Sequence, residues 1–290
     1  MNSRRTELLK ELDEKARRIR VHVIRIAGMS ECHTGGSLSI ADLLSALYFH
    51  VMKVDPKNPK WEGRDYFILS KGHCVPALDA ALAVRGFFPE SVLTTHLHLD
   101  SIISGHACAR LTPGIDASTG SLGHGLSIGV GAALGVRMDD ASNRVFVLLG
   151  DGELQEGSVW EAAMAAAHHK LDHLIAIVDR NMYQTGPTEH MMKLEPLAEK
   201  WKSFGWAVRT IDGHNMGAIV DALEALPFEQ GRPSLVIANT VKGKGVSFIQ
   251  NRHVLQFKED QLQAALRELG EPRSNPGPPR ECGLERGEPV

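Results

Sequence analysis

Two short polar segments of this sequence directly follow apolar runs and carry the residue types that bind a phosphate and a metal ion. The first is Gly150-Asp151-Gly152-Glu153, which follows the run Val145–Leu149 and precedes a helical stretch from Gly157 to Lys170. A helix that begins just after a strand directs its free N–H groups at a ligand, which suits a phosphate. Because Asp151 would repel a phosphate unless a divalent cation lay between them, it is predicted to bind a hard metal such as Mg²⁺.

The second segment, Asp179 to Tyr183, follows the apolar run Leu174–Val178. If the two runs form neighbouring strands, Asn181 lies beside Asp151, and an amide oxygen with a carboxylate makes a suitable pair of Mg²⁺ ligands. Each segment by itself also fits an ordinary turn, because Gly-Asp-Gly and Asx residues are frequent turn formers. The pair, separated by one helical stretch, favours a binding site.

Short apolar runs alternate with helical stretches along the chain, which is typical of a parallel sheet covered by helices. The expected strands are Tyr66–Leu69, Val145–Leu149, Leu174–Val178, Trp206–Thr210 and Leu235–Ala238. The expected helices are Glu7–Gly28, Ala41–Val51, Trp160–Lys170, Met216–Ala225 and Glu259–Leu269. We expect residues 1–269 to form one α/β domain, and residues 270–290, with five prolines and four glycines, to form a disordered tail.

The composition excludes several classes of protein. A net charge of −3, with 43% hydrophobic and 6% aromatic residues, is ordinary for a globular chain and argues against a disordered or a basic nucleic-acid-binding protein. No apolar run approaches the ~20 residues of a transmembrane helix, and the highly charged N-terminus does not resemble a signal peptide. Four cysteines without a CxxC pair do not suggest a disulfide framework, so the cytoplasm is the expected location.

The Gly-Asp-Gly segment with its later asparagine resembles the signature of the thiamine-diphosphate-dependent enzymes, and the surrounding sequence resembles the transketolase family from about residue 5 to 250. The segments that carry the resemblance are ECHTGGSLSIADLLSALYF (31–49), LSKGHCVPALDAAL (69–82), SGHACARLTPGIDASTGSLGHGLSIGVGAALG (104–135), GDGELQEGSVWEAAMAAAHHKLDHLIAIVDRN (150–181) and TVKGKGVSF (240–248). The resemblance implies a three-layer α/β/α fold with a central, mainly parallel sheet. It also implies transfer of a two-carbon ketol unit from a ketose phosphate to an aldehyde acceptor.

The resemblance implies a role for each matching residue. The metal, Mg²⁺ with Ca²⁺ or Mn²⁺ as substitutes, would be held by Asp151, the Asn181 side chain and the Tyr183 carbonyl. Thiamine diphosphate would contact His73, Gly120, Ser121, Leu122, Gly150, Gly152 and Glu153. His33 and His106 would line the substrate channel, hydrogen-bond sugar hydroxyls and help to move protons, as imidazole does near neutral pH. Glu156 and Glu161 would lie at a subunit interface, although acids also favour helix N-termini for electrostatic reasons.

The histidines have a competing interpretation as a zinc site. Imidazole and thiolate are zinc ligands, and Cys32-His33, His73-Cys74 and His106-X-Cys108 place them together. The spacings match no zinc pattern that we know. A lone histidine is most often structural or solvated, so the residue type alone does not indicate a function. The assignment of these histidines to a substrate channel rests on the resemblance to the family.

Two features depart from a full-length transketolase. The family carries, after this domain, a second domain whose glutamate activates the cofactor and then a third domain, so the chain is expected to be the N-terminal subunit of a split transketolase. We expect an α₂β₂ assembly with a separate C-terminal subunit, and no activity without it.

In addition, a Trp-His-Gly-like stretch of the family is replaced by Ile249-Gln-Asn-Arg-His253-Val-Leu-Gln-Phe. We expect His253 to fill the role of the catalytic histidine in that stretch. An unusual donor or acceptor substrate would fit this change.

Three other functions compete with this interpretation. One is the α-subunit of a 2-oxo-acid dehydrogenase or a deoxyxylulose-phosphate-synthase-like enzyme, which shares the cofactor motif but does not need His33, His73 and His106. Another is a degenerate subunit without cofactor, against which the intact Gly150, Asp151, Gly152 and Asn181 argue. The third is an unrelated nucleotide-binding protein, but no GxGxxG follows a strand and no GxxxxGK[ST] is present.

Overall fold

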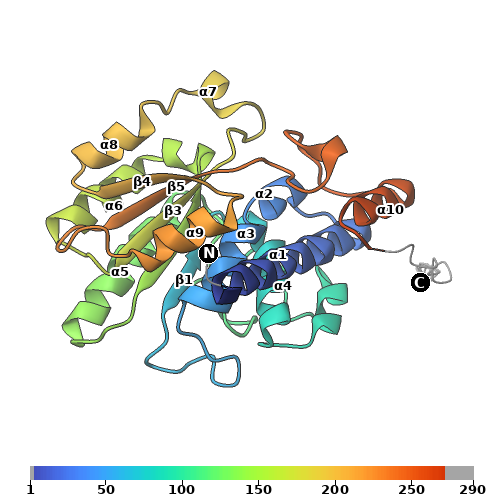
Figure 1. The fold of residues 1–290 in the computed structure, drawn as a ribbon, viewed down its shortest axis with the longest axis horizontal. Coiled ribbons are helices and arrows are strands. Elements are labelled where there is room, and N and C mark those ends of the chain that lie inside the picture. Colours follow the sequence, from blue (N-terminus) through green and yellow to red (C-terminus); the bar gives the residue numbers. More distant parts are fainter. Residues whose placement is uncertain (1–2, 272–290) are drawn as a thin grey trace, which may run out of the picture.

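A computed structural model describes residues 3–271 of the chain, which are built around a five-stranded parallel sheet (Figure 1). The strands are β1 (Tyr66–Leu69), β2 (Val145–Gly150), β3 (Leu174–Arg180), β4 (Ala207–Asp212) and β5 (Ser234–Asn239), in the order β1-β2-β3-β5-β4. All neighbouring strands are parallel, and Gly150 is paired with Asp179. The carboxyl ends of β2 and β3 are therefore level with each other, and all five predicted strands are confirmed.

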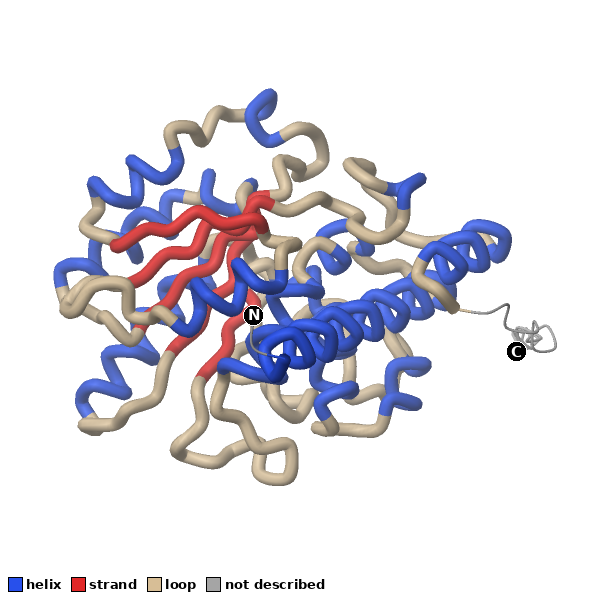
Figure 2. The backbone as a smooth tube through the Cα atoms, in the orientation of Figure 1, coloured by secondary structure: helices blue, strands red, loops and turns tan. Residues whose placement is uncertain are grey.

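Helices cover both faces of the sheet, which confirms the three-layer α/β/α fold (Figure 2). One face packs against α5 (His124–Met138), α6 (Gly157–His168) and α8 (Leu197–Ser203). The opposite face packs against α1 (Ser3–Met29), α3 (Ala41–Ala46), α4 (Val75–Arg85) and α9 (Met216–Glu224). Along β2, Phe146 and Leu148 belong to one core, whereas Val145, Val147 and Leu149 belong to the other. Alternate side chains of each strand thus enter opposite cores, as two-sided burial requires.

Shorter elements complete the fold. They are α2 (Thr34–Leu38), a π turn (Leu47–Val51), α7 (Thr188–Met191), α10 (Glu259–Glu268), and 3₁₀ turns at Gly72–Cys74, Glu90–Thr95, Gly152–Gln155 and Ser247–Ile249. The predicted helix over 41–51 is therefore α3 followed by the π turn. Within residues 3–271, no helix is both long and apolar enough to cross a membrane.

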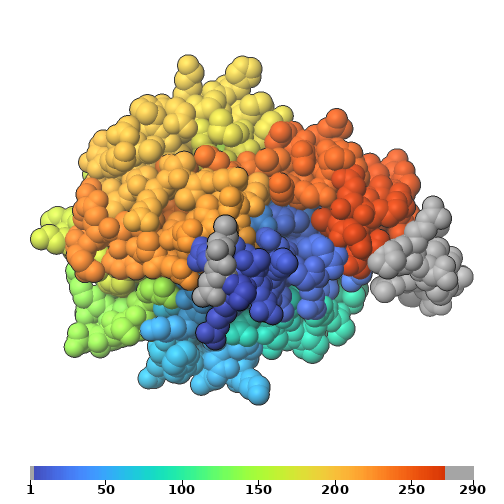
Figure 3. All heavy atoms as spheres, in the orientation of Figure 1, coloured from blue at the N-terminus to red at the C-terminus, as the bar shows by residue number. Residues whose placement is uncertain are grey.

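The end of the described chain returns to the N-terminal helix. Helix α10 packs along α1, and Figure 3 shows the two segments, red and blue, in contact on one face. Glu271 forms ion pairs with Arg17 and Arg25, each at 2.9 Å. The first residues of the predicted tail, 270 and 271, are therefore part of the described structure, while residues 272–290 lie outside it. The boundary of the domain at residue 269 stays a prediction.

Candidate functional site

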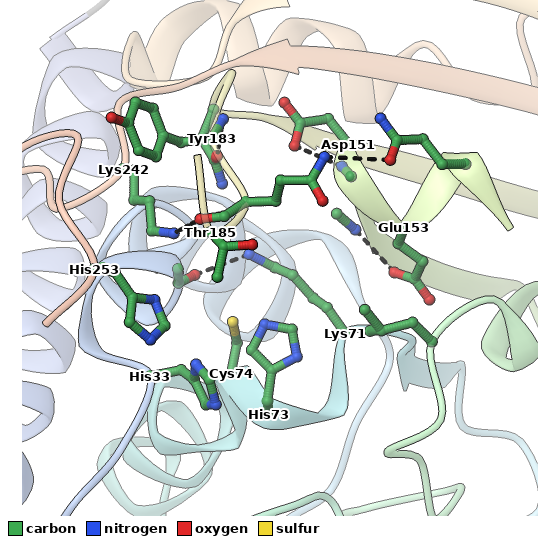
Figure 4. Close-up of a pocket in the computed structure, with 18 of the residues that line it drawn as sticks. His33, Lys71, His73, Cys74, Asp151, Glu153, Tyr183, Thr185, Lys242 and His253 are labelled. Atoms are coloured by element: carbon green, nitrogen blue, oxygen red, sulfur yellow. Dashed lines mark hydrogen bonds between the residues drawn. The ribbon is translucent and has the colours of Figure 1, made fainter. Parts of the chain in front are cut away.

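A cavity of about 320 Å³ lies at the carboxyl edge of the sheet (Figure 4). Its lining residues come mainly from the segments that follow β1, β2, β3 and β5, together with the start of α2. Of the residues predicted from the sequence, it contains His33, His73, Leu122, Gly150, Asp151, Gly152, Glu153, Glu156, Asn181, Tyr183 and His253. Four predicted residues do not line it, namely His106, Gly120, Ser121 and Glu161. The edge of the sheet therefore gathers most of the predicted site, as parallel topology requires.

Asp151, Asn181 and Tyr183 lie on one wall of this cavity. The backbone N–H of Met182 donates to Asp151 Oδ2 at 2.7 Å, so the segment after β3 lies directly against the aspartate. The segment that contains Asn181 therefore lies beside Asp151, as the pairing of β2 with β3 requires, and the role of Asn181 as a metal ligand stays a prediction. Burial and the neighbouring Asp179 raise the pKa of Asp151, while Arg180, whose guanidinium lies 3.1 Å from Oδ2, opposes this shift.

The three predicted metal ligands form a suitable donor set. A carboxylate, an amide oxygen and a main-chain carbonyl are all hard oxygen ligands of the kind that Mg²⁺ prefers. The backbone at Gly152 packs closely on Gln184, because a Cβ there would lie only 3.0 Å from the Gln184 side chain. These residues fit a metal-bound diphosphate.

Two lysines that the sequence analysis missed bring positive charge to the cavity. Lys71 is 3% exposed, and its Nζ donates to Asp179 Oδ2 at 2.6 Å and to the Gly36 carbonyl at 2.8 Å. Lys242 donates to the Gln184 carbonyl at 2.6 Å, and burial lowers the pKa of its ammonium. Both lysines closely follow a strand, Lys71 after β1 and Lys242 after β5. The rule that selected Asp151 would have found them too.

Three imidazoles form the wall opposite Asp151 and Tyr183 (Figure 4). The ring centroid of His33 lies 4.6 Å from that of His73 and 5.6 Å from that of His253. Burial, reinforced by His73 for His33 and by Lys71 for His73, lowers the pKa of each of these two histidines to about 4. Burial also lowers the pKa of His253. At neutral pH this wall presents uncharged imidazoles, which donate and accept hydrogen bonds.

His106 lies close to this wall but outside the lining of the cavity. Its ring packs near Gly120, where a Cβ would lie 3.3 Å from the imidazole. Burial and, to a smaller extent, the nearby His73 lower the pKa of His106. Of the predicted segment Gly120-Ser121-Leu122, only Leu122 reaches the cavity.

Glu153 is turned into the protein and shapes the floor of the site. Its side chain accepts a hydrogen bond from Ser70 Oγ and, at 2.9 Å each, from the backbone N–H groups of Gly123 and Gly150. Burial raises its pKa. Both carboxylate oxygens already have protein donors, so Glu153 holds the ends of β1 and β2 and the start of α5 together. Its predicted contact with a cofactor stays a prediction.

The acids predicted at a subunit interface lie at the edge of the cavity and beyond it. Glu156 is exposed and lines the cavity, whereas Glu161 is exposed on α6. Both are therefore accessible to another chain, and their interface role stays a prediction.

The zinc interpretation finds no support in the described part of the chain. Between residues 3 and 271, no group of three or more His, Cys, Asp or Glu side chains is arranged to hold a metal ion. Cys32, Cys74 and Cys108 are all free thiols.

Asp179 lies at the end of β3 and joins side chains from four segments around the cavity by hydrogen bonds. No role was predicted for it from the sequence. It is fully buried, and its carboxylate accepts hydrogen bonds from Ser39, Lys71, Asn181 and Thr240. Burial alone would raise its pKa, but Lys71 and the hydroxyl donors outweigh this, and the pKa of Asp179 lies below its usual value.

Comparison with known proteins identifies relatives over nearly the whole chain. Residues 12–276 match the family described as transketolase, thiamine diphosphate binding domain. The chain is 49% identical to the 6-deoxy-6-sulfo-D-fructose transketolase subunit SqwG of Clostridium sp. (strain MSTE9), over 82% of this chain and 88% of that protein. It is 43% identical to an apulose-4-phosphate transketolase subunit of Phocaeicola vulgatus, over 91% and 95% of the two chains.

Solved structures show the same relationship. A transketolase from Leishmania mexicana superposes with a TM-score of 0.84 at 26% identity, covering 90% of this chain and 41% of that one. The transketolase of Campylobacter jejuni gives a TM-score of 0.83 at 30% identity, covering 93% and 43%. The chain thus spans about two fifths of these longer proteins, but almost all of the relatives named as subunits.

Proposed function

The chain belongs to the transketolase family, and we propose that it is the thiamine-diphosphate-binding, N-terminal subunit of a two-chain transketolase. One observation carries this proposal. A single cavity brings together three oxygen donors, Asp151, Asn181 and Tyr183, with two lysines and a wall of neutral imidazoles. The reaction would move a two-carbon ketol unit from a ketose phosphate to an aldehyde acceptor.

We propose that the oxygen-donor wall holds Mg²⁺, or Ca²⁺ or Mn²⁺ in its place, with the diphosphate of the cofactor. The carboxylate of Asp151, the amide oxygen of Asn181 and the carbonyl of Tyr183 would be ligands of the metal. Lys71 and Lys242 supply positive charge beside the diphosphate, and Gly150 and Gly152 allow it to approach the backbone. When bound, thiamine diphosphate supplies the electron sink for breaking and forming the carbon–carbon bond.

The imidazole wall would bind the sugar. His33, His73 and His253 are uncharged at neutral pH, because the pKa of each is lowered by burial. A neutral imidazole accepts a proton from one hydroxyl while it donates to another, so these groups orient the ketol end and move protons there. His106, just outside the cavity lining, would join them when substrate extends past Gly120. The present chain would therefore bind the hydroxyl groups of the sugar, and not the anionic end of the substrate.

The remainder of the active site would come from a partner chain. Single-chain transketolases are about two and a half times as long as the segment matched here, and the relatives of similar length are named as subunits. We propose an α₂β₂ heterotetramer in which Glu156 and Glu161 lie at a subunit interface. A cytoplasmic location agrees with the three free thiols among the described residues.

The relatives suggest a class of substrate. One is named for 6-deoxy-6-sulfo-D-fructose and another for apulose 4-phosphate. We propose a ketose with an anionic end group, either a sulfonate or a phosphate, as the donor. No observation favours the alternative function in a 2-oxo-acid dehydrogenase.

The test begins with recovery of the tagged chain from its host in Mg²⁺ and thiamine diphosphate, followed by native mass spectrometry. A complex of two plus two chains that carries the cofactor is the expected result. The complex is then assayed with ketose phosphates, a sulfoketose and pyruvate, with Asp151→Asn as the inactive control. Ketol transfer by the isolated chain would exclude the two-chain proposal, and consumption of pyruvate alone would favour the decarboxylating alternative.

A further inference from the structure

Asp179 is a buried carboxylate at the end of β3 that collects side chains from four separate segments. It has no exposed surface, and it lies level with Gly150 of β2 and Ala238 of β5. Its Oδ2 accepts from Ser39 Oγ at 2.8 Å, from Lys71 Nζ at 2.6 Å and from Asn181 Nδ2 at 2.7 Å, and its Oδ1 accepts from Thr240. The proposed function gives Asp179 no role.

The contact with Asn181 fixes the orientation of that amide. An aspartate beside a lysine ammonium is ionised and has no proton to donate, so the Asn181 atom that faces it must be the NH₂ group. The Oδ1 atom then lies on the other side, where it accepts from the Tyr183 N–H at 3.0 Å. The two ends of the amide are almost equivalent in shape, so its orientation depends on these two contacts, and Asp179 supplies the one that selects the NH₂ group.

We propose that Asp179 is a positioning residue that holds the Asn181 amide with its oxygen, and not its NH₂ group, available to the metal ion. The inference rests on the proposed function, because it assumes that Asn181 is a metal ligand. An NH₂ group turned toward a cation repels it, so loss of this contact weakens metal binding even though Asn181 itself is unchanged.

Asp179→Asn tests this inference, with Asp65→Asn as the matched control. Asp65 is 1% exposed and pairs with Arg144 at 2.6 Å, but it precedes β1, at the opposite edge of the sheet. Both changes remove a buried charge that is paired with a basic side chain. Mn²⁺ is titrated into the full chain with thiamine diphosphate, and free Mn²⁺ is measured by electron paramagnetic resonance. We expect at least tenfold weaker binding for Asp179→Asn, and wild-type binding for Asp65→Asn.

A double-mutant cycle separates positioning from a general loss of structure. Asn181→Ala removes the amide and is expected to weaken Mn²⁺ binding by itself. If Asp179 acts through Asn181, adding Asp179→Asn to Asn181→Ala changes the affinity less than twofold. If Asp179→Asn costs as much in the Asn181→Ala background as in the wild type, the inference is overturned.

The wild-type chain decides the matter if Asp179→Asn does not fold. With ¹⁵N-labelled asparagine, and with the Asn181 signal assigned by its loss in Asn181→Ala, the side-chain NH₂ of Asn181 is expected to exchange with solvent at least tenfold more slowly than that of exposed Asn58. Equal rates would overturn the inference. A wild-type chain that takes up no Mn²⁺ with thiamine diphosphate would instead refute the proposed function, whereas equal binding by Asp179→Asn and Asp65→Asn would refute the inference alone.

Discussion

Gly125, in the first turn of α5, packs directly on Ser70, and we expect Gly125→Ala to lower the stability of the chain substantially. A Cβ at this position would lie 2.6 Å from Cα of Ser70, and still closer to its Cβ and Oγ. Atoms that are not bonded to each other do not approach this closely, and one of the three is in the backbone. Either α5 or the end of β1 must therefore move.

The size of the effect follows from three contributions. Forcing an extra methyl group into a packed core costs roughly 1–3 kcal/mol. Displacing Ser70 also removes its hydrogen bond to the buried Glu153 carboxylate, which costs about 1–3 kcal/mol more. The better helix propensity of alanine returns at most about 1 kcal/mol. The free energy of unfolding should therefore fall by roughly 3 kcal/mol, within a range of about 1–6 kcal/mol.

Gly131→Ala, in the same helix, is the matched control. A Cβ there meets nothing within 4 Å, so only the propensity term applies and the isolated chain should become up to about 1 kcal/mol more stable. Urea denaturation followed by tryptophan fluorescence measures both variants. A Gly125→Ala chain as stable as the wild type, or the same change in stability for both variants, would refute the close-packing argument.

Three further predictions concern the site and its pH dependence. Asp151→Asn removes the carboxylate from the proposed metal ligands, so Mg²⁺-dependent binding of thiamine diphosphate should weaken at least tenfold by calorimetry. With the pKa of each lowered to about 4, His33 and His73 should show no titration between pH 6 and 8 by NMR; a midpoint near 6.5 would contradict this. His96 is 3% exposed, and burial lowers its pKa to about 4. Since the unfolded chain binds the extra proton below pH ~6.5, His96 alone should contribute about 2 kcal/mol to the loss of stability between pH 7 and 5, and His96→Asn should make that loss smaller by this amount when both chains are unfolded in urea at the two pH values.

The order of the elements could be predicted from the sequence because each apolar run is long enough for a strand buried on both faces. Since the carboxyl ends of parallel strands share one edge, the residues just after the runs had to converge there. Asp151 and Asn181 were found in this way, and Lys71 and Lys242 satisfy the same rule. The position of these four residues at one edge of the sheet thus follows from the local sequence and the parallel topology alone.

Only the tertiary structure decided which way the side chains turn at that edge. Glu153 follows the same strand as Asp151, yet it points into the protein, where Ser70 and two backbone N–H groups bind its carboxylate. His253 reaches His33 from a distant part of the chain, whereas His106 stays outside the cavity lining. Asp179 obtains its partners from four segments. Hydrophobic periodicity specifies which face of a strand is buried, but the partner of a buried polar group depends on the packing of elements far apart in sequence.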